Sequence, residues 1–239
     1  MSQTLSFADS PSLDDLQVYL KRAARVEDGA VRLIASGNVL LVYSAILYRR
    51  GLLDQSPTVL GLRTFALDEP LTLDTVVTVR SLLDRIARVV AGPRHGAGPV
   101  ELAVPFETTT VSWAGISPPR SGWQPLGEMD VAVLEAAARS GIDEVAAAIP
   151  SGTGEALVQK VRSTVWSQPI DALEYIEDPA QPGLPAGSGD GPVRGAVPAG
   201  AGFAAVSLGF LAADERVQLF RSGSWLRLST SRGHVLVKS

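Results

Sequence analysis

Two tryptophans and an arginine lie together in one turn-rich stretch, residues 113–123. Trp113 and Trp123 bound this loop, Arg120 precedes the second ring by three residues, and two adjacent prolines stiffen its middle. A guanidinium beside an indole suits a planar or anionic ligand, or an anchor point for a partner protein. Because proline restriction lowers the entropy lost on binding, we predict that Trp113, Arg120 and Trp123 form the ligand- or partner-binding site. The structural alternative is that the tryptophans fill the core and the arginine stacks on them.

A second group of candidate binding residues lies near the end of the chain. Residues 214–239 hold five Lys or Arg against two Asp or Glu, a local charge of +3 in a chain whose net charge is −4. Apolar and polar residues alternate there with the period of a strand that has one buried face. The polar positions include Arg216, Arg227, His234 and Lys238, and Arg232 lies at a predicted turn. The secondary candidates are Arg216, Arg227, Arg232 and His234.

A basic sheet face that also carries an aromatic residue such as Phe220 could bind single-stranded nucleic acid or a phosphate ligand. The alternative is an ordinary solvated face. The acidic balance of the whole chain favours this alternative, so we do not expect nucleic acid as a partner.

Residue types that support catalysis are scarce. The chain has no cysteine and only two histidines, His95 and His234, which excludes Cys nucleophiles, disulfides, iron–sulfur clusters and His-rich metal sites. A Ser–His–Asp arrangement needs a well-placed His base, no nucleophile-elbow motif is present, and the glycine-rich stretches lack the lysine of a P-loop. We therefore expect no metal and no cofactor. An enzyme with an Asp/Glu acid–base pocket between sheet and helices stays open as an alternative.

The elements that must position these residues mix helices and strands. Apolar residues at helical spacing predict helices over residues 12–26, 74–91, 129–140, 143–149 and 154–166. Apolar and β-branched runs predict strands over residues 30–36, 39–48, 59–67, 100–106 and 108–113.

The second of these strands carries the strongest fold prediction. Residues 39–47 are apolar on both faces, which is typical of a central, fully buried strand. Gly37 and Asn38 before them have the composition of a two-residue hairpin turn, so residues 30–36 should pair back onto this strand.

The C-terminal third divides into a loop and a sheet. Residues 178–202 are rich in glycine and proline and predict an internal loop or linker. Residues 203–239 predict a four-stranded meander over 203–211, 216–221, 225–230 and 234–238. Because so small a sheet is marginal alone, we expect it to pack on the main body. The sequence thus predicts a single α+β domain over residues 1–239, with a mostly antiparallel sheet covered by helices.

Composition sets the class of protein. Hydrophobic residues make up 46% of the chain and charged residues 19%, as in a globular protein. Acidic residues near the start argue against a signal peptide, and residues 197–213 form too short an apolar stretch for a membrane span. We expect a soluble, cytoplasmic, non-enzymatic binding or interaction protein with an unknown protein or small-molecule partner and no membrane contact. A homo-oligomer is compatible with the sequence.

Overall fold

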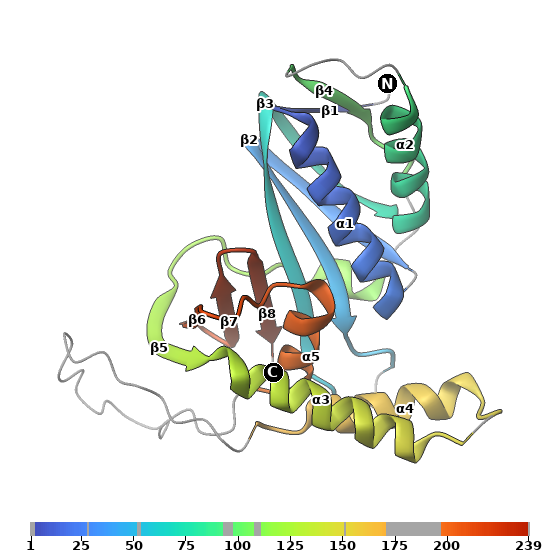
Figure 1. Cartoon of the computed structure of the whole chain (residues 1–239), viewed down its shortest axis with the longest axis vertical. Helices are drawn as coiled ribbons and strands as arrows, with labels where there is room; N and C mark the ends of the chain where they lie inside the picture. Colours follow the sequence, from blue (N-terminus) through green and yellow to red (C-terminus); the bar gives the residue numbers. More distant parts are fainter. Residues whose placement is uncertain are drawn as a thin grey trace. The chain divides into compact units, whose positions relative to one another are not determined.

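The computed structural model describes residues 3–27, 29–51, 54–92, 98–107, 111–150, 152–170 and 197–238. Five α-helices and eight strands occur in these ranges, and the strand pairs with an assigned register are antiparallel, so the predicted α+β class is confirmed (Figure 1). None of the helices in these ranges is long and apolar enough to cross a membrane.

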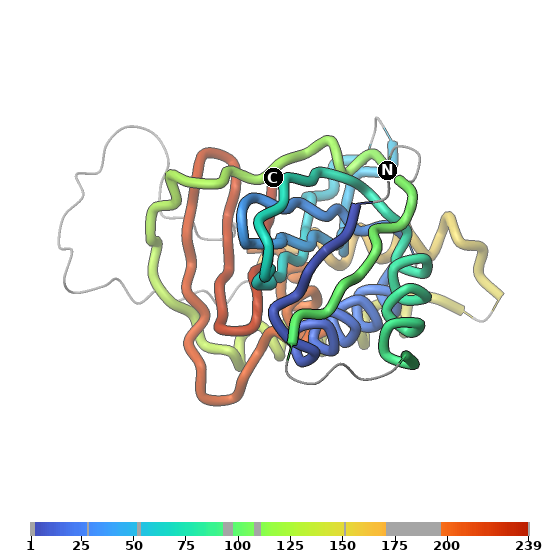
Figure 2. Tube along the Cα trace, turned by 90° about the horizontal axis from the view of Figure 1, so that it is seen from above, coloured from blue at the N-terminus to red at the C-terminus, as the bar shows by residue number. Residues whose placement is uncertain are grey.

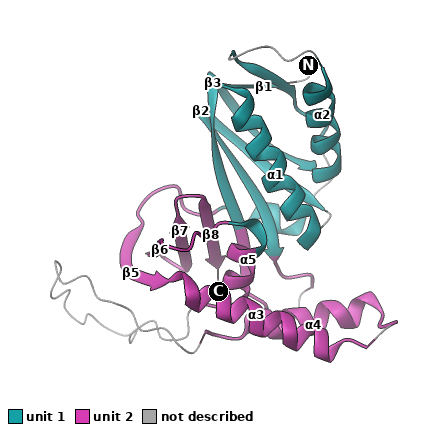
Figure 3. Cartoon of the chain, viewed as in Figure 1, with its two compact units in different colours: residues 1–46, 61–117, 207–209 teal, residues 47–60, 118–206, 210–239 magenta. Residues whose placement is uncertain are grey.

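The chain forms two compact units (Figure 3). Unit 1 comprises Met1–Ile46, Gly61–Ser117 and Ser207–Gly209, and unit 2 comprises Leu47–Leu60, Pro118–Val206 and Phe210–Ser239. The expectation of one domain over residues 1–239, with residues 203–239 packed on the main body, stays a prediction.

Unit 1 is a sheet covered by two helices. Its strands are β1 (Thr4–Phe7), β2 (Ala30–Leu47), β3 (Thr58–Thr78) and β4 (Val100–Ala103). The order is β4-β1-β3, and β2 also pairs with β3. Helices α1 (Ser10–Val26) and α2 (Val79–Ala91) pack side by side over this sheet (Figure 1).

Both helices of unit 1 begin at side-chain caps. The Ser12 amide donates to the Asp9 carboxylate over 2.8 Å, so α1 starts slightly earlier than predicted. Helix α2 starts later than predicted, because β3 continues through Thr78, whose hydroxyl accepts from the Ser81 amide at 3.2 Å. The apolar stripe of α1 is buried as its spacing predicted, through Leu13, Leu16, Tyr19, Leu20 and Ala23.

The predicted hairpin turn at Gly37 and Asn38 is wrong, because β2 runs through both residues as one strand. Gly37 takes a positive φ of 61° inside the strand, which glycine permits. The Asn38 amide donates to the carbonyls of Leu67 and Asp68, both at 3.1 Å, and so ties β2 to β3. Residues 30–36 were predicted to pair with residues 39–47, but both segments belong to β2, and the strand that pairs with β2 is the long β3.

Residues 39–47 form a strand as predicted, but their central position in the sheet is wrong. Among the described strands, β2 pairs with β3 alone and therefore lies at an edge. Residues 42–47 are nevertheless buried, whereas Leu41 is half-buried and Val39 is 45% exposed. Helix α1 contributes to this burial, since the Tyr19 hydroxyl lies 3.3 Å from the Val42 carbonyl. A covering helix, rather than a second strand neighbour, explains the apolar run.

We expect Leu40→Ala to lower the free energy of unfolding by about 2–5 kcal/mol, because Leu40 is fully buried. Leu41→Ala is the matched control and should cost less, since that side chain is half-exposed. Urea denaturation of the two variants measures the difference. Equal losses, or a larger loss for Leu41→Ala, would contradict the burial pattern of β2.

Unit 2 holds an antiparallel sheet in the order β5-β6-β7-β8, whose strands are β5 (Gln124–Asp130), β6 (Arg216–Ser222), β7 (Trp225–Thr230) and β8 (Gly233–Lys238). Figure 2 shows β5, β6 and β7 running side by side. Three strands of the predicted meander are confirmed. Its fourth strand is β5, which comes from the segment predicted as loop and the start of a helix.

Residues 203–211 were predicted as a strand and instead lie largely in helix α5 (Ala199–Leu208). The helix also takes in residues 199–202 of the predicted linker, while residues 178–196 lie outside the described residues. The sequence of α5 is almost entirely alanine, glycine and other apolar residues, so it has no polar face to reveal a helical period. A helix that is apolar all round is a buried one.

Two further helices complete unit 2, α3 (Val131–Ala148) and α4 (Glu155–Ser167), which pack against each other. The predicted break at Gly141 is wrong, because α3 is continuous through it. A side chain at this position would meet the Trp166 ring, with a Cβ only 2.2 Å from Cζ3. Gly141 therefore serves close helix packing. In unit 1, the end of the strand predicted over residues 108–113 is the short 3₁₀ helix η1 (Ser112–Gly115), and residues 108–110 lie outside the described residues.

Candidate functional site

The β5–β8 sheet has an apolar face and a second face, here called the polar face, on which polar residues lie beside the buried Trp225 and Leu236. Its register places Phe220 opposite Arg227, and Ser229 opposite His234. Side chains directly opposite each other share a face, so these four residues lie on one side of the sheet. The other side is the buried face that the apolar alternation predicted. Its residues are Val217, Leu219, Leu226, Leu228, Val235 and Val237.

Arg227 is held between two aromatic rings on the polar face. Its guanidinium carbon lies 4.4 Å from the centroid of Phe220 and 4.7 Å from that of Trp123. Trp123 immediately precedes β5, and its indole N–H donates to the Pro119 carbonyl over 3.1 Å, which fixes the ring. Both contacts are within the range of cation–π attraction. We call Trp123, Phe220 and Arg227 the stacked-arginine site.

The donors of this guanidinium have no hydrogen-bond partner among the described residues. In the described part of the chain, Arg227 makes no hydrogen bond or ion pair, and its buried Nε has no partner. Burial lowers the pKa of Arg227 from its ordinary value, although a guanidinium stays charged at neutral pH. A partly buried cation without an anion is costly, so this site is suited to receive one.

His234 extends the polar face beside the stacked arginine. Its Nδ1 lies 2.9 Å from the Ser229 hydroxyl oxygen. Burial, and then the positive charge of Arg227, lower the pKa of His234 below its ordinary value. Both effects favour the neutral imidazole over the imidazolium.

The remaining secondary candidates have partners elsewhere. Arg216 forms ion pairs with Glu128 at 3.6 Å and with Asp130 at 3.5 Å. Arg232 is exposed and donates to the Leu211 carbonyl over 3.3 Å. Of the four secondary candidates, Arg227 contacts Trp123, and His234 lies on the same sheet face as Arg227.

The three residues of the predicted loop site belong to different compact units. Trp113 belongs to η1 in unit 1. Its side chain is 4% exposed, so it is a core residue, as the structural alternative expected. Arg120 is exposed and Trp123 is half-buried, and both belong to unit 2. The role of these residues in binding stays a prediction.

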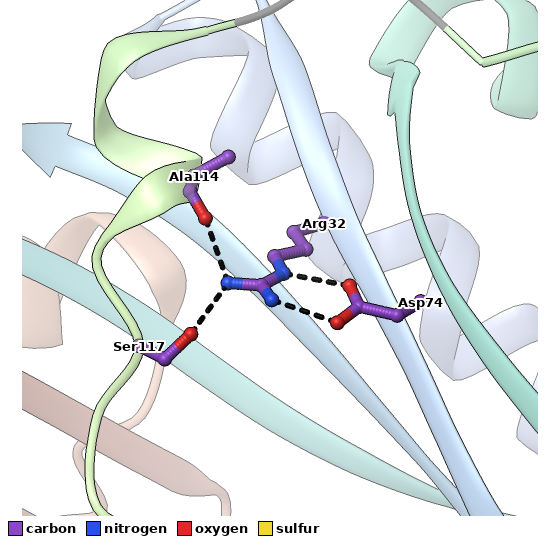
Figure 4. A network of polar contacts seen from close by, with 4 residues as sticks. All are labelled: Arg32, Asp74, Ala114 and Ser117. Atoms are coloured by element: carbon purple, nitrogen blue, oxygen red, sulfur yellow. Dashed lines mark hydrogen bonds and ion pairs between the residues drawn. The ribbon is translucent and has the colours of Figure 1, made fainter.

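Arg32 in unit 1 was not singled out from the sequence, and its contacts contrast with those of Arg227. It forms two 2.8 Å contacts with the Asp74 carboxylate and also donates to the Ala114 carbonyl at 2.7 Å and the Ser117 hydroxyl at 2.9 Å (Figure 4). These contacts attach residues 114–117 to β2 and β3. Because its donors are satisfied internally, Arg32 supports the fold and offers little to a ligand.

The fold and the site define a two-unit α+β protein that presents an arginine between two aromatic rings on a sheet face. The chain belongs to the family described as Domain of unknown function (DUF8185), whose model matches residues 118–239. A second family model, Domain of unknown function (DUF8010), matches residues 1–115. Comparison with curated protein sequences gives no match.

Similar solved structures include a DNA polymerase sliding clamp from Caulobacter crescentus, with 12% identity and a TM-score of 0.48 over 99% of this chain. A sliding clamp from Bartonella birtlesii, bound to griselimycin, has 11% identity and a TM-score of 0.48 over the full chain. The β chain of DNA polymerase III from Streptococcus pneumoniae TIGR4 has 9% identity and a TM-score of 0.49, also over the full chain. The chain spans 64–65% of the length of these proteins. Such low values assign it no function.

We expect the double variant Arg120→Ala, Trp123→Ala to lose about 0.5–2 kcal/mol of stability, because Trp123 is half-buried and stacks on one arginine. Replacing a tryptophan of the core with alanine would lower the stability by about 3–5 kcal/mol. Thermal denaturation distinguishes the two values. A loss in the higher range would mean that the ring of Trp123 is a core residue and would remove it from the binding site.

Proposed function

We propose that the protein is a non-enzymatic binding protein that recognises an anionic group of its ligand at the stacked-arginine site. The observation that carries the proposal is the Arg227 guanidinium, which contacts the rings of Phe220 and Trp123 and whose donors have no partner in the described part of the chain. The edge of a planar guanidinium matches the two oxygens of a carboxylate or phosphate.

Rigidity supports binding at this position. Arg227 and Phe220 are cross-strand neighbours on β7 and β6, and the Trp123 ring is anchored by its bond to Pro119. The rings hold the arginine in place before a ligand arrives, so little side-chain entropy is lost on binding. Aromatic and arginine side chains are also those most enriched at the energetic centres of interfaces.

The test is calorimetric titration of the full chain with inorganic phosphate and with acetate. We expect saturable binding of both anions. Arg227→Gln should lower the affinity by about tenfold or more, because it removes charge-assisted hydrogen bonds to the anion. The affinity of Arg227→Lys should lie between those of the wild type and Arg227→Gln, because lysine keeps the charge and lacks the planar guanidinium. Arg232→Gln is the matched control, since it removes the same charge from an exposed position in the turn between β7 and β8.

Two results would refute the proposal. One is the absence of saturable binding of either anion to the intact chain. The other is equal weakening by Arg232→Gln and Arg227→Gln, which would show that the anions respond to the general charge of the sheet and not to the stacked arginine.

Nucleic acid is the partner that the basic strands most readily suggest, and we expect it to bind weakly. Arg216 is neutralised by Glu128 and Asp130, so fewer cations of the meander are available to phosphates. Few phosphate contacts release few counterions, so they contribute little to the affinity for nucleic acid at physiological salt. Fluorescence anisotropy with a labelled single strand at ~0.15 M salt tests this. Sub-micromolar binding that Arg227→Gln abolishes would contradict it and identify a polynucleotide as the source of the anion.

A further inference from the structure

We infer that the stacked-arginine site takes a dianionic tetrahedral group of the phosphate monoester class, and that His234 becomes its second charged donor by gaining a proton as the anion binds. This inference rests on the proposed function and adds to it the chemistry of the ligand and a dependence on pH.

The sheet places the two side chains within reach of one ligand. Ser229 follows Arg227 by two residues on β7 and pairs directly with His234 on β8. Arg227 and His234 are therefore diagonal neighbours on the same face, a relation in which Cα atoms lie roughly 7–8 Å apart. Long side chains at such positions can contact the same small anion.

His234 also has a ring nitrogen to offer. Ser229 occupies Nδ1, and no partner of Nε2 occurs in the described part of the chain. A carboxylate has two oxygens, and the edge of the Arg227 guanidinium satisfies both. A phosphate monoester has a third unesterified oxygen and a second negative charge, which an imidazolium matches.

The charges around His234 set the direction of the coupling. In the free protein, burial and the Arg227 charge hold the pKa of His234 below its ordinary value. The other charged groups of this face are Lys238 over Trp225 at the end of β8, and the cluster of Arg216 with Glu128 and Asp130 on β6 and β5.

An anion at Arg227 offsets the repulsion that the arginine exerts on the imidazolium and adds an attraction of its own. The pKa of His234 therefore rises when the anion binds. Because linkage is reciprocal, the affinity for the anion must increase as the pH falls toward the pKa of His234 in the bound state.

The experiment is a pH titration of the imidazole carbon-bound protons by NMR in the full chain. His95→Gln leaves His234 as the single histidine, so its resonance needs no further assignment. Sulfate is the main probe, because it stays dianionic across the range in which histidine titrates. Acetate is the monoanionic control. Inorganic phosphate and O-phosphoserine form separate arms, because the same dianion could come from solution or from a modified side chain.

We expect saturating sulfate to raise the pKa of His234 by about one unit and acetate to raise it less. In Arg227→Gln the pKa should already be higher without ligand, and sulfate should no longer move it. His234→Gln should still bind sulfate at Arg227, but its affinity for sulfate should no longer increase as the pH falls.

The two proposals fail in different ways. If sulfate binds in a manner that depends on Arg227 and the pKa of His234 does not move, the inference is wrong and the proposed function stands. The same conclusion follows if acetate binds as tightly as sulfate at every pH. If neither anion binds the intact chain, the proposed function fails, and this inference fails with it.

Discussion

Replacing Trp166 with alanine should lower the free energy of unfolding by about 3–5 kcal/mol, the range for emptying a large aromatic site in a core. Trp166 is 3% exposed and stacks on Phe203, with ring centroids 4.3 Å apart and planes 17° apart. It also packs against Gly141 of α3 and Gly200 of α5, and so connects three helices of unit 2. Urea denaturation followed by circular dichroism measures the loss.

Two further substitutions separate packing from polar effects at this ring. Gly141→Ala should cost about 1–3 kcal/mol through overpacking, because its Cβ would lie 2.2 Å from the ring. Trp166→Phe should cost less than Trp166→Ala, since it keeps an aromatic ring and removes a buried indole N–H that has no partner among the described residues. A loss below about 1 kcal/mol for Trp166→Ala would show that the three helices do not depend on this residue.

Tyr19→Phe should lower the free energy of unfolding by about 1–3 kcal/mol, the cost of leaving a buried polar partner unpaired. The Tyr19 hydroxyl lies 2.8 Å from Ser44 Oγ and donates toward the carbonyls of Gly61 and Val42 at 3.1 and 3.3 Å. It thus connects α1 to both long strands of unit 1. The double variant Tyr19→Phe, Ser44→Ala should recover part of the loss, because it removes both partners.

Alkaline pH gives a second measure of the same hydroxyl. Desolvation raises the pKa of Tyr19 above its ordinary value, so the folded protein keeps this proton when the unfolded chain releases it. The contribution of Tyr19 is therefore complete below about pH 10 and is lost as the pH rises above that value. Stability curves should fall more steeply in the wild type than in Tyr19→Phe over this range. Parallel curves would mean that the hydroxyl is accessible to solvent.

Sequence periodicity correctly predicted the helices and strands that are recognised from apolar residues a few positions apart. The apolar stripe of α1, helix α4 and the alternation along β6, β7 and β8 each depend on residues a few positions apart, and each is found in the structure. The same local signal placed Arg227 and His234 on the polar face of the sheet. Such patterns can be read from sequence because one buried face repeats with the period of the backbone.

Other features depend on partners that are distant in the chain. The Gly37–Asn38 pair has the composition of a turn, yet β2 pairs with the long β3 and continues through both residues as one strand. Helix α5 has no polar face, so its residues have no helical period to detect, and burial alone made it a helix. The continuity of α3 through Gly141 likewise depends on Trp166, which lies on another helix.

The candidate site divides in the same way. The sequence by itself determined that Trp123 lies in a restricted loop and that Arg227 lies on a polar strand face, because both follow from neighbouring residues. Only the tertiary structure decided that β5 pairs with β6 and thereby brings Trp123 over Arg227, opposite the ring of Phe220. It also decided that Arg32 has partners for its donors and that Arg227 has none among the described residues. Whether a charged side chain is satisfied depends on groups far along the chain, and no local pattern records them.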